Sequence, residues 1–234
     1  YLRALLPIFI FSIFVGIVVY EIQKNSSLVA PIGIILSIWV ILGAWSEFFT
    51  KNKIFSTNYQ LVLYRVFQMR ASDWGKIIAH SGFGIIIFGI SSITAWEIED
   101  IRVVKIGEQF SVGNYKFTLK NVINKNGPNY VSTMGVIDVI DRKNRYIATL
   151  EPEKRFFPTQ SITTTEAAID NGLKRDIYIV LGSKQSQSEW VIRTYIKPFV
   201  NWIWLGAFIL SLGGLLSIFD KKVRIGIASR KEQV

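Results

Sequence analysis

The sequence predicts a multi-pass α-helical membrane protein with an inserted extracytoplasmic domain, rich in β-strands, that forms a small barrel or sandwich. Two observations lead to this prediction. Half of the 234 residues are hydrophobic, and many of them gather in four windows without a single charged side chain. The long segment between the third and fourth windows instead alternates apolar and polar residues between turn signals, which is typical of half-buried strands.

The four uncharged windows are long enough to cross a bilayer, because a hydrocarbon core takes about 20 apolar residues. These windows are Ala4–Tyr20, Leu28–Ser46, Ile77–Trp96 and Phe199–Phe219. The first is followed by charged and polar residues rather than by a small-residue cleavage site, so we interpret it as a span and not a signal peptide. Because the chain opens at Tyr1 without a methionine, we expect a fragment or one piece of a divided polypeptide.

Basic residues predict the orientation of these spans. The loop Lys51–Lys76 carries five basic residues against one acid, and the tail after Phe219 carries five against two. Positive-inside reasoning places both segments in the cytoplasm, which leaves residues 97–197 outside. This topology also explains the net charge of +10 without nucleic acid as a partner. We therefore expect a bacterial inner membrane protein with a periplasmic domain, a mitochondrial inner membrane being the less favoured location.

Six segments follow from this pattern. The connector 50–74 mixes apolar residues with Arg65 and Arg70, which is typical of an amphipathic helix lying in the membrane interface, although a helix packed on the bundle is an equal alternative. The expected segments are 1–49 with two transmembrane helices, 50–74 as this cytoplasmic or interfacial connector, 75–96 as the third span, 97–197 as the periplasmic β-rich domain, 198–220 as the fourth span and 221–234 as a basic cytoplasmic tail.

Residues 97–197 show the period of β-strands. In Tyr115–Leu119, apolar side chains alternate with polar ones, as in a half-buried strand. Further candidate strands are Val136–Ile140, Tyr146–Leu150, Asp176–Leu181 and Trp190–Ile196. Turn residues such as Gly113 and Asn114 separate them, and Thr164–Ile169 is expected to form one helical turn. Several short strands with regular turns predict a small barrel or sandwich.

Small residues in the last span predict close helix packing. Gly206 and Gly213 fall on one face at helical spacing, and Ala207, Ser211 and Gly214 fall on another. Small side chains let the backbones of two helices approach each other. We therefore expect this helix to pack tightly against its neighbours.

The only histidine, His80, lies inside the third uncharged window. An ionisable group at such depth is a functional candidate, because a charge there costs at least a few kcal/mol. The functional alternatives are a proton relay and metal or haem ligation, and the structural one is a neutral imidazole bonded to a neighbouring helix. Gly84 and Ser91 follow His80 on the same face, and Ser81 and Gly82 keep the adjacent surface thin, as a porphyrin beside its axial ligand requires, although small residues also serve helix packing.

Other chemistry is disfavoured by composition. The chain has no cysteine and one histidine, which excludes a structural zinc site of the usual ligands, and the histidine's position in the membrane disfavours a Ser-His-Asp hydrolase. Met69 and Met134 both fall outside the spans, so a haem bound at His80 would take its second axial ligand from elsewhere.

The segment from Trp74 to Gly82, Trp-Gly-Lys-Ile-Ile-Ala-His-Ser-Gly, resembles the WGxxxAHxG segment of the CcmF family of cytochrome c haem lyases, which is grouped with NrfE and CcsA. Further strings resemble the C-terminal part of that family, in the same order. They are Gly127-Pro-Asn-Tyr130, Pro152-Glu-Lys-Arg155, Thr165-Glu-Ala-Ala-Ile-Asp170, Arg175-Asp-Ile-Tyr178 and the run from Lys197 to Gly206. The resemblance covers nearly the whole chain, but only about the last third of a typical family member.

The resemblance implies a function in cytochrome c maturation. Such proteins take haem from a periplasmic haem chaperone and attach it through two thioethers to the CxxCH motif of an apocytochrome c. A membrane b-type haem supplies electrons that keep the arriving haem reduced, and His80 matches the family histidine that is an axial ligand of that haem's iron. The implied partners are the N-terminal part of the same lyase, the haem chaperone, apocytochrome c with its thiol-handling subunits, and membrane lipid, but no nucleic acid.

Three alternatives stay open at this point. A close relative devoted to a nitrite reductase cytochrome would share the same residues, and a non-haem membrane scaffold would only recruit partners in a cytochrome assembly complex. A small transporter would require broken helices and polar groups at the midplane, of which the spans offer little beyond His80. In the external domain, Tyr130, Arg155 and Glu166 lie in family-like strings and are candidates either for partner contacts or for fixing turns; no catalytic residue is assigned.

Overall fold

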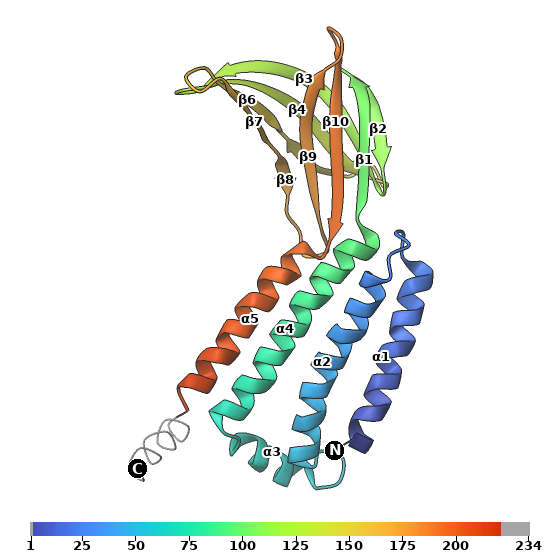
Figure 1. The fold of residues 1–234 in the computed structure, drawn as a ribbon, viewed down its shortest axis with the longest axis vertical. Helices are drawn as coiled ribbons and strands as arrows, with labels where there is room; N and C mark the ends of the chain where they lie inside the picture. Colours follow the sequence, from blue (N-terminus) through green and yellow to red (C-terminus); the bar gives the residue numbers. More distant parts are fainter. Residues whose placement is uncertain (1, 221–234) are drawn as a thin grey trace. The chain divides into compact units, whose positions relative to one another are not determined.

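The computed structural model describes residues 2–220, so the predicted basic tail 221–234 lies outside the described residues. The chain divides into two compact units (Figure 1). The helical unit is built from the residues before Glu97 and those after Pro198, and the β unit is Glu97–Pro198.

Five helices form the helical unit, and four of them are long and apolar enough to span a membrane. The helices are α1 (Leu2–Ile22), α2 (Val29–Asn52), α3 (Tyr59–Phe67), α4 (Ala71–Trp96) and α5 (Val200–Ile218). Helices α1, α2, α4 and α5 lie side by side in that order (Figure 1). The predicted fold of four apolar helices with an inserted β-rich domain is confirmed.

Helices α2 and α4 extend beyond their uncharged windows at the ends where their added charges pair with each other. Helix α2 continues past Ser46 to Asn52, and α4 begins before Ile77, at Ala71. Lys51 Nζ lies 2.6 Å from Asp73 Oδ2, and Lys76 forms a second ion pair with Glu47. In the first pair α2 supplies the base and α4 the acid, and in the second pair these roles are exchanged.

Glycines bring α4 and α5 into backbone contact. On α4, Gly75, Gly82 and Gly89 recur every seven residues, and on α5 Gly206 and Gly213 show the same spacing. A Cβ built on Gly82 would lie 2.7 Å from the carbonyl oxygen of Gly206, and one on Gly213 would lie 2.6 Å from that of Gly75. No side chain fits at these positions, so this seam fixes which face of α4 meets α5.

The expected close packing of the last helix is thus confirmed for one of its two small-residue faces. Gly206 and Gly213 are buried against α4. Gly214 does not pack in this way. Apart from its chain neighbours and the backbone of its own helical turn, no described atom lies within 4 Å of where its Cβ would sit. Ser211, on the same face as Gly214, is exposed.

The β unit contains ten strands in two antiparallel sheets. One sheet has the order β1-β10-β9-β8; the other runs β2-β3-β4-β6-β7, with β5 also paired to β4. The strands are β1 (Ile98–Lys105), β2 (Gln109–Val112), β3 (Tyr115–Asn126), β4 (Val131–Asp141), β5 (Tyr146–Leu150), β6 (Glu153–Phe157), β7 (Ile162–Glu166), β8 (Ala168–Asp170), β9 (Arg175–Lys184) and β10 (Glu189–Pro198).

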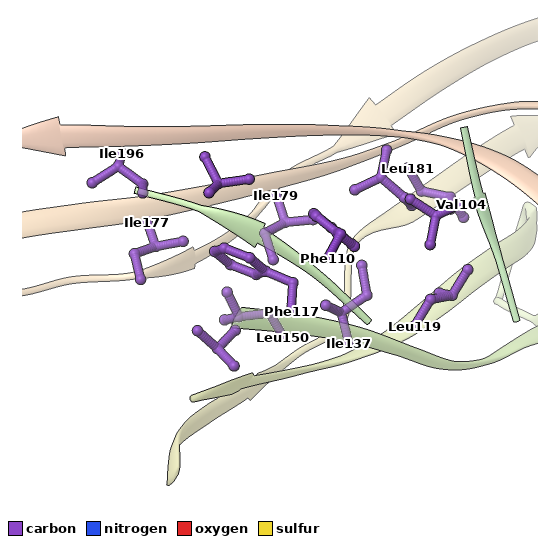
Figure 2. Close-up of a cluster of buried hydrophobic side chains, with 13 residues drawn as sticks. Val104, Phe110, Phe117, Leu119, Ile137, Leu150, Ile177, Ile179, Leu181 and Ile196 are labelled. Carbon is purple, nitrogen blue, oxygen red and sulfur yellow. The ribbon is translucent and has the colours of Figure 1, made fainter. Parts of the chain in front are cut away.

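The core of the β unit lies between these two sheets. Alternate residues of each strand point inward, because successive side chains of a strand face opposite sides. Figure 2 shows Ile177, Ile179 and Leu181 of β9 facing Phe117 and other buried side chains of the second sheet. All four of these side chains are fully buried. The unit is therefore a sandwich, the second of the two architectures that the sequence predicted.

One local prediction is wrong. Thr164–Ile169, expected to form a helical turn, is extended: β7 ends at Glu166, and β8 begins at Ala168 in the other sheet. Three consecutive threonines precede Glu166, and β-branched residues favour strands. Their pairing with β6, in which Arg155 lies opposite Thr164, decides the conformation.

The glycine seam predicts a large difference between two neighbouring substitutions on α5. Gly213→Ala would place a methyl group within 2.8 Å of Ala79 Cα and of the Gly75 carbonyl, so α4 and α5 must separate. We expect a loss of about 1–3 kcal/mol in the free energy of unfolding, as for overpacked cores. The measurement is denaturant unfolding in detergent, followed by tryptophan fluorescence.

Gly214→Ala is the matched control, because its methyl group enters open space on the same helix. It should leave stability unchanged or raise it slightly through helix propensity. Equal destabilisation by both substitutions would contradict the assignment of the seam.

Candidate functional site

His80 projects from α4 into an open cavity of about 280 Å³ in the helical unit. The side chain is exposed in this chain, although its position in the sequence is inside an apolar span. The cavity is lined by residues of three helices: Leu5 of α1, Trp39, Val40, Gly43, Ala44 and Glu47 of α2, and Lys76 and His80 of α4. Its walls are mostly apolar, and one end carries the ion pair between Glu47 and Lys76.

A single hydrogen bond decides the tautomer of His80. Its Nδ1 lies 2.8 Å from the backbone carbonyl oxygen of Lys76, one turn earlier on the same helix. Because a carbonyl only accepts, Nδ1 is the donor in this contact, and in the neutral imidazole the lone pair is then on Nε2. Metal-ligating histidines are commonly held in this way, with the other ring nitrogen donating to a carbonyl or carboxylate. The sequence analysis left open a hydrogen bond from His80 to a neighbouring helix. The Nδ1 atom instead bonds to the backbone of its own helix.

The thin surface beside His80 comes from α2 and not from its own helix. Apart from the chain neighbours of Gly43 and the backbone of its own helical turn, no described atom lies within 4 Å of where a Cβ on Gly43 would sit. The adjacent Ala44 also lines the cavity. These two residues were missed by the sequence analysis. Their spacing to Glu47, one helical turn later on α2, is the signal that could have indicated them.

The glycines that the sequence analysis chose for this purpose serve helix packing instead, which corrects the expectation of a clear flank on α4. Gly82 faces α5, and a Cβ there would lie 2.9 Å from Leu210 Cα. Gly84 faces α2, where Ser37 Oγ donates a hydrogen bond of 2.8 Å to the Gly84 carbonyl. The alternative interpretation, that small residues bring helices together, is the correct one for both.

In the β unit, the three residues singled out from family-like strings come together. The Arg155 guanidinium lies 4.8 Å from the centre of the Tyr130 ring, and its Nη1 lies 4.0 Å from Glu166 Oε1. Arg155 Nε also donates a 2.8 Å hydrogen bond to Glu153. The Tyr130 ring covers Gly127, where a Cβ would clash with the ring atoms. These contacts join β6, β7 and the β3–β4 hairpin, so they stabilise this end of the sheet.

The electrostatics of this cluster follow from the same contacts. The hydrogen bond from Arg155 lowers the pKa of Glu153, and a bond donated by Ser132 Oγ acts in the same direction. The pKa of Arg155 is raised, chiefly by its hydrogen bond to Glu153. Both groups therefore stay charged at neutral pH. A role of Tyr130, Arg155 or Glu166 in binding partners stays a prediction.

A second polar network connects the two sheets. Arg175 Nε of β9 donates a 2.8 Å hydrogen bond to the hydroxyl of Tyr115, which belongs to β3 of the other sheet. Arg175 Nη1 also pairs with Asp170 Oδ2 of β8 at 2.5 Å. Both Asp170 and Arg175 belong to strings that resemble the CcmF family, and here they hold the sandwich together. Among the described residues, no group of three or more His, Cys, Asp or Glu side chains could hold a metal ion.

Comparisons with known proteins agree with the likeness seen in the sequence. The family model described as CcmF C-terminal beta-sandwich matches residues 95–198, which include the whole β unit. The cytochrome c-type biogenesis protein Ccl1 of Rhodobacter capsulatus is 36% identical over 232 residues, which make up 99% of this chain and 34% of that protein. The chain belongs to the CcmF family. CcmF of Haemophilus influenzae is 34% identical over 213 residues, 91% of this chain and 32% of that protein.

The CcmF family is also represented by a solved structure with the same fold. A structure entitled Cytochrome c Heme Lyase CcmF matches 92% of this chain and 34% of its own, with a TM-score of 0.64 and 13% sequence identity. This chain spans about a third of the length of these relatives and corresponds to their C-terminal part. Its four apolar helices and its bacterial CcmF relatives indicate an inner membrane protein.

The cluster around Arg155 predicts a pH-dependent stability of strands β6 and β7. A carboxyl group with a lowered folded pKa contributes stability above its unfolded pKa, about 4.3 for glutamate, and loses it as the pH falls through the folded value. We therefore expect hydrogen-exchange protection factors in β6 and β7 to fall between about pH 5 and pH 3.

Glu153→Gln should remove most of this pH dependence and lower protection already at neutral pH. Glu151→Gln, which changes an exposed acid two residues earlier, is the matched control and should leave the pH dependence unchanged. A Glu153→Gln variant that keeps the full pH dependence would contradict this assignment.

Proposed function

We propose that this chain is the C-terminal portion of a cytochrome c maturation haem lyase, in which His80 is one axial ligand of a membrane b-type haem. The observation that supports the proposal best is the hydrogen bond between His80 Nδ1 and the Lys76 carbonyl. In the neutral imidazole this bond leaves the lone pair on Nε2, His80 lines a cavity in the helical unit, and an imidazole nitrogen is a common axial ligand of haem iron.

The residues around His80 fit one side of a haem. Apolar side chains of Trp39, Val40 and Leu5 line the cavity, and Gly43 leaves room for a flat group to lie against α2. His80 is the only histidine of the chain, so the second axial ligand would come from outside it. The part of the family sequence that this chain does not span is the expected source of that ligand.

In this proposal, the residues of the chain act by orientation and by exclusion of water. The Lys76 carbonyl holds the imidazole ring in one tautomer, and the glycine seam with α5 holds α4 itself. The apolar wall of α2 would lower the polarity around a bound haem, and burial of this kind is one means by which a protein tunes a haem. When bound, a b-type haem supplies one-electron chemistry, which would keep the haem destined for the cytochrome reduced.

The rest of the proposed function concerns partners and orientation. The basic α2–α4 loop supports a cytoplasmic position for that loop and a periplasmic one for the β unit. The lyase would take haem from a periplasmic haem chaperone and attach it to the CxxCH motif of an apocytochrome c, whose thiols are absent from this chain because they belong to the substrate. The β unit would serve as a docking surface for the apocytochrome and its thiol-handling subunits.

The visible spectrum tests the ligand assignment. We expect this chain, co-expressed with the part of the family sequence that it does not span and purified in detergent, to show a b-type spectrum after dithionite reduction. His80→Ala should abolish that spectrum while size-exclusion behaviour and helical content stay unchanged. A spectrum unaffected by His80→Ala would remove the assignment and favour the alternative, a non-haem scaffold whose compact β unit recruits partners.

The position of Gly43 tests where the haem lies. Gly43→Leu would fill the depression beside His80 without displacing any described atom at its Cβ, so the helices should still pack. We expect at least a tenfold loss of haem occupancy, because the leucine side chain would take the place of the ring; optical titration of the apoprotein with haem measures it. Gly43→Ala is the control and should lose little, and equal haem binding by the leucine variant would contradict this position.

A further inference from the structure

The ion pair between Glu47 and Lys76 lies at the same cavity as His80. Lys76 and His80 are four residues apart on α4, so their side chains lie on one face of the helix, separated by about 6 Å along its axis. Glu47 reaches the same place from α2. Among the described residues that line the cavity, Lys76 is the only one with a positive charge.

A second ion pair joins the same two helices, so Lys76 is not the only ionic link between α2 and α4 among the described residues. Lys51 Nζ and Asp73 Oδ2 lie 2.6 Å apart and already connect α2 to α4. Neither of these residues lines the cavity of His80. Of the two bridges between the helices, only one therefore places its cation beside the candidate ligand.

The ammonium group of Lys76 has capacity for a further acceptor. It carries three N–H donors, and the ion pair with Glu47 uses one oxygen of that carboxylate. The Lys76 side chain keeps 43% of its accessible surface, compared with 30% for Glu47. A flexible four-carbon stem lets the ammonium follow an incoming anion while it stays near the cavity.

A haem whose iron lies at His80 Nε2 would bring two propionate carboxylates to this region. A carboxylate that leaves water without a counter-charge costs several kcal/mol, so haem sites of low polarity need a cation near the propionate edge. Trp39, Val40 and Leu5 offer no such group, and the ion-paired end of the cavity does.

We propose that Lys76 binds a haem propionate and thereby orients the porphyrin, with its propionate edge toward the N-terminal end of α4. This inference rests on the proposed haem ligation by His80. Lys76 is a positioning residue here, while Glu47 holds the ammonium at the cavity before haem arrives. Because Glu47 is itself an anion, it repels a propionate and contributes nothing to holding it.

The two partners of the ion pair are therefore expected to differ in their effect on haem affinity. In the co-purified complex, Lys76→Gln should weaken the binding of haem b about tenfold, the usual effect of losing a hydrogen bond to a charged group. Glu47→Gln should leave the affinity equal or higher. Lys51→Gln, which breaks only the second bridge, should not change it. Optical titration of the apoprotein gives each dissociation constant.

Haem b dimethyl ester, whose propionates carry no charge, separates this proposal from a general loss of structure. Lys76→Gln should bind the ester as well as the wild type does, and Lys76→Arg should restore the affinity for haem b. The proposal would be overturned if Lys76→Gln lost equal affinity for haem b and its ester, or if the Lys76 and Glu47 variants lost equal affinity for haem b. The ion pair would then only hold α2 and α4 together.

These outcomes are distinct from a failure of the proposed ligand. If the wild type and His80→Ala bind haem b equally, the ligation by His80 is wrong, and the role of Lys76 falls with it. If His80→Ala abolishes binding while Lys76→Gln has no effect, only the propionate contact is wrong.

Discussion

The close contact between the backbones of α4 and α5 is the constraint on which the helical unit depends. Gly75, Gly82 and Gly89 occupy one face of α4, and no side chain fits between that face and α5. Residues two positions apart on an α-helix point in nearly opposite directions, because each residue turns the helix by about 100°. Burying Gly82 against α5 therefore turns His80 to the other side of α4, where it meets the cavity along α2.

Helix α2 completes the environment of His80 by a different kind of contact. Ser37 bonds to the Gly84 carbonyl, and the two ion pairs join the ends of the helices at which both carry charges. Between these contacts, the small residues Gly43 and Ala44 leave a depression in the surface of α2. The result is an imidazole held by its own helix, facing an apolar surface with the ion pair of Glu47 and Lys76 at its end. In the proposed haem lyase, this site would receive a flat, mostly apolar group that carries a metal and an acidic edge.

The β unit shows how strings that resemble the family can carry structural roles. Asp170 and Arg175, far from Tyr115 in sequence, link the two sheets at their polar margin, and Arg155 gathers Tyr130 and Glu166 at the end of one sheet. Burial of the apolar faces supplies most of the stability of a sandwich, but it does not decide how sheet ends close. Guanidinium groups that stack on tyrosine and pair with carboxylates determine which strands meet at the sheet ends.

The sequence alone determined the class of the molecule: uncharged windows of spanning length can be buried only in lipid or in other helices, and the period of two in Tyr115–Leu119 predicts a strand wherever it lies. It also determined His80 as the candidate ligand, because a single ionisable residue in an apolar window is costly without a function. Tertiary structure decided what surrounds it. Gly43 and Gly82 are alike in sequence, but the packing of α4 against α5 buries Gly82, whereas Gly43 on α2 lies where no neighbouring helix meets its Cβ position. Likewise, the threonines around Thr164 favour an extended path, but their pairing with Arg155 of β6 is a contact between strands that local preference cannot specify.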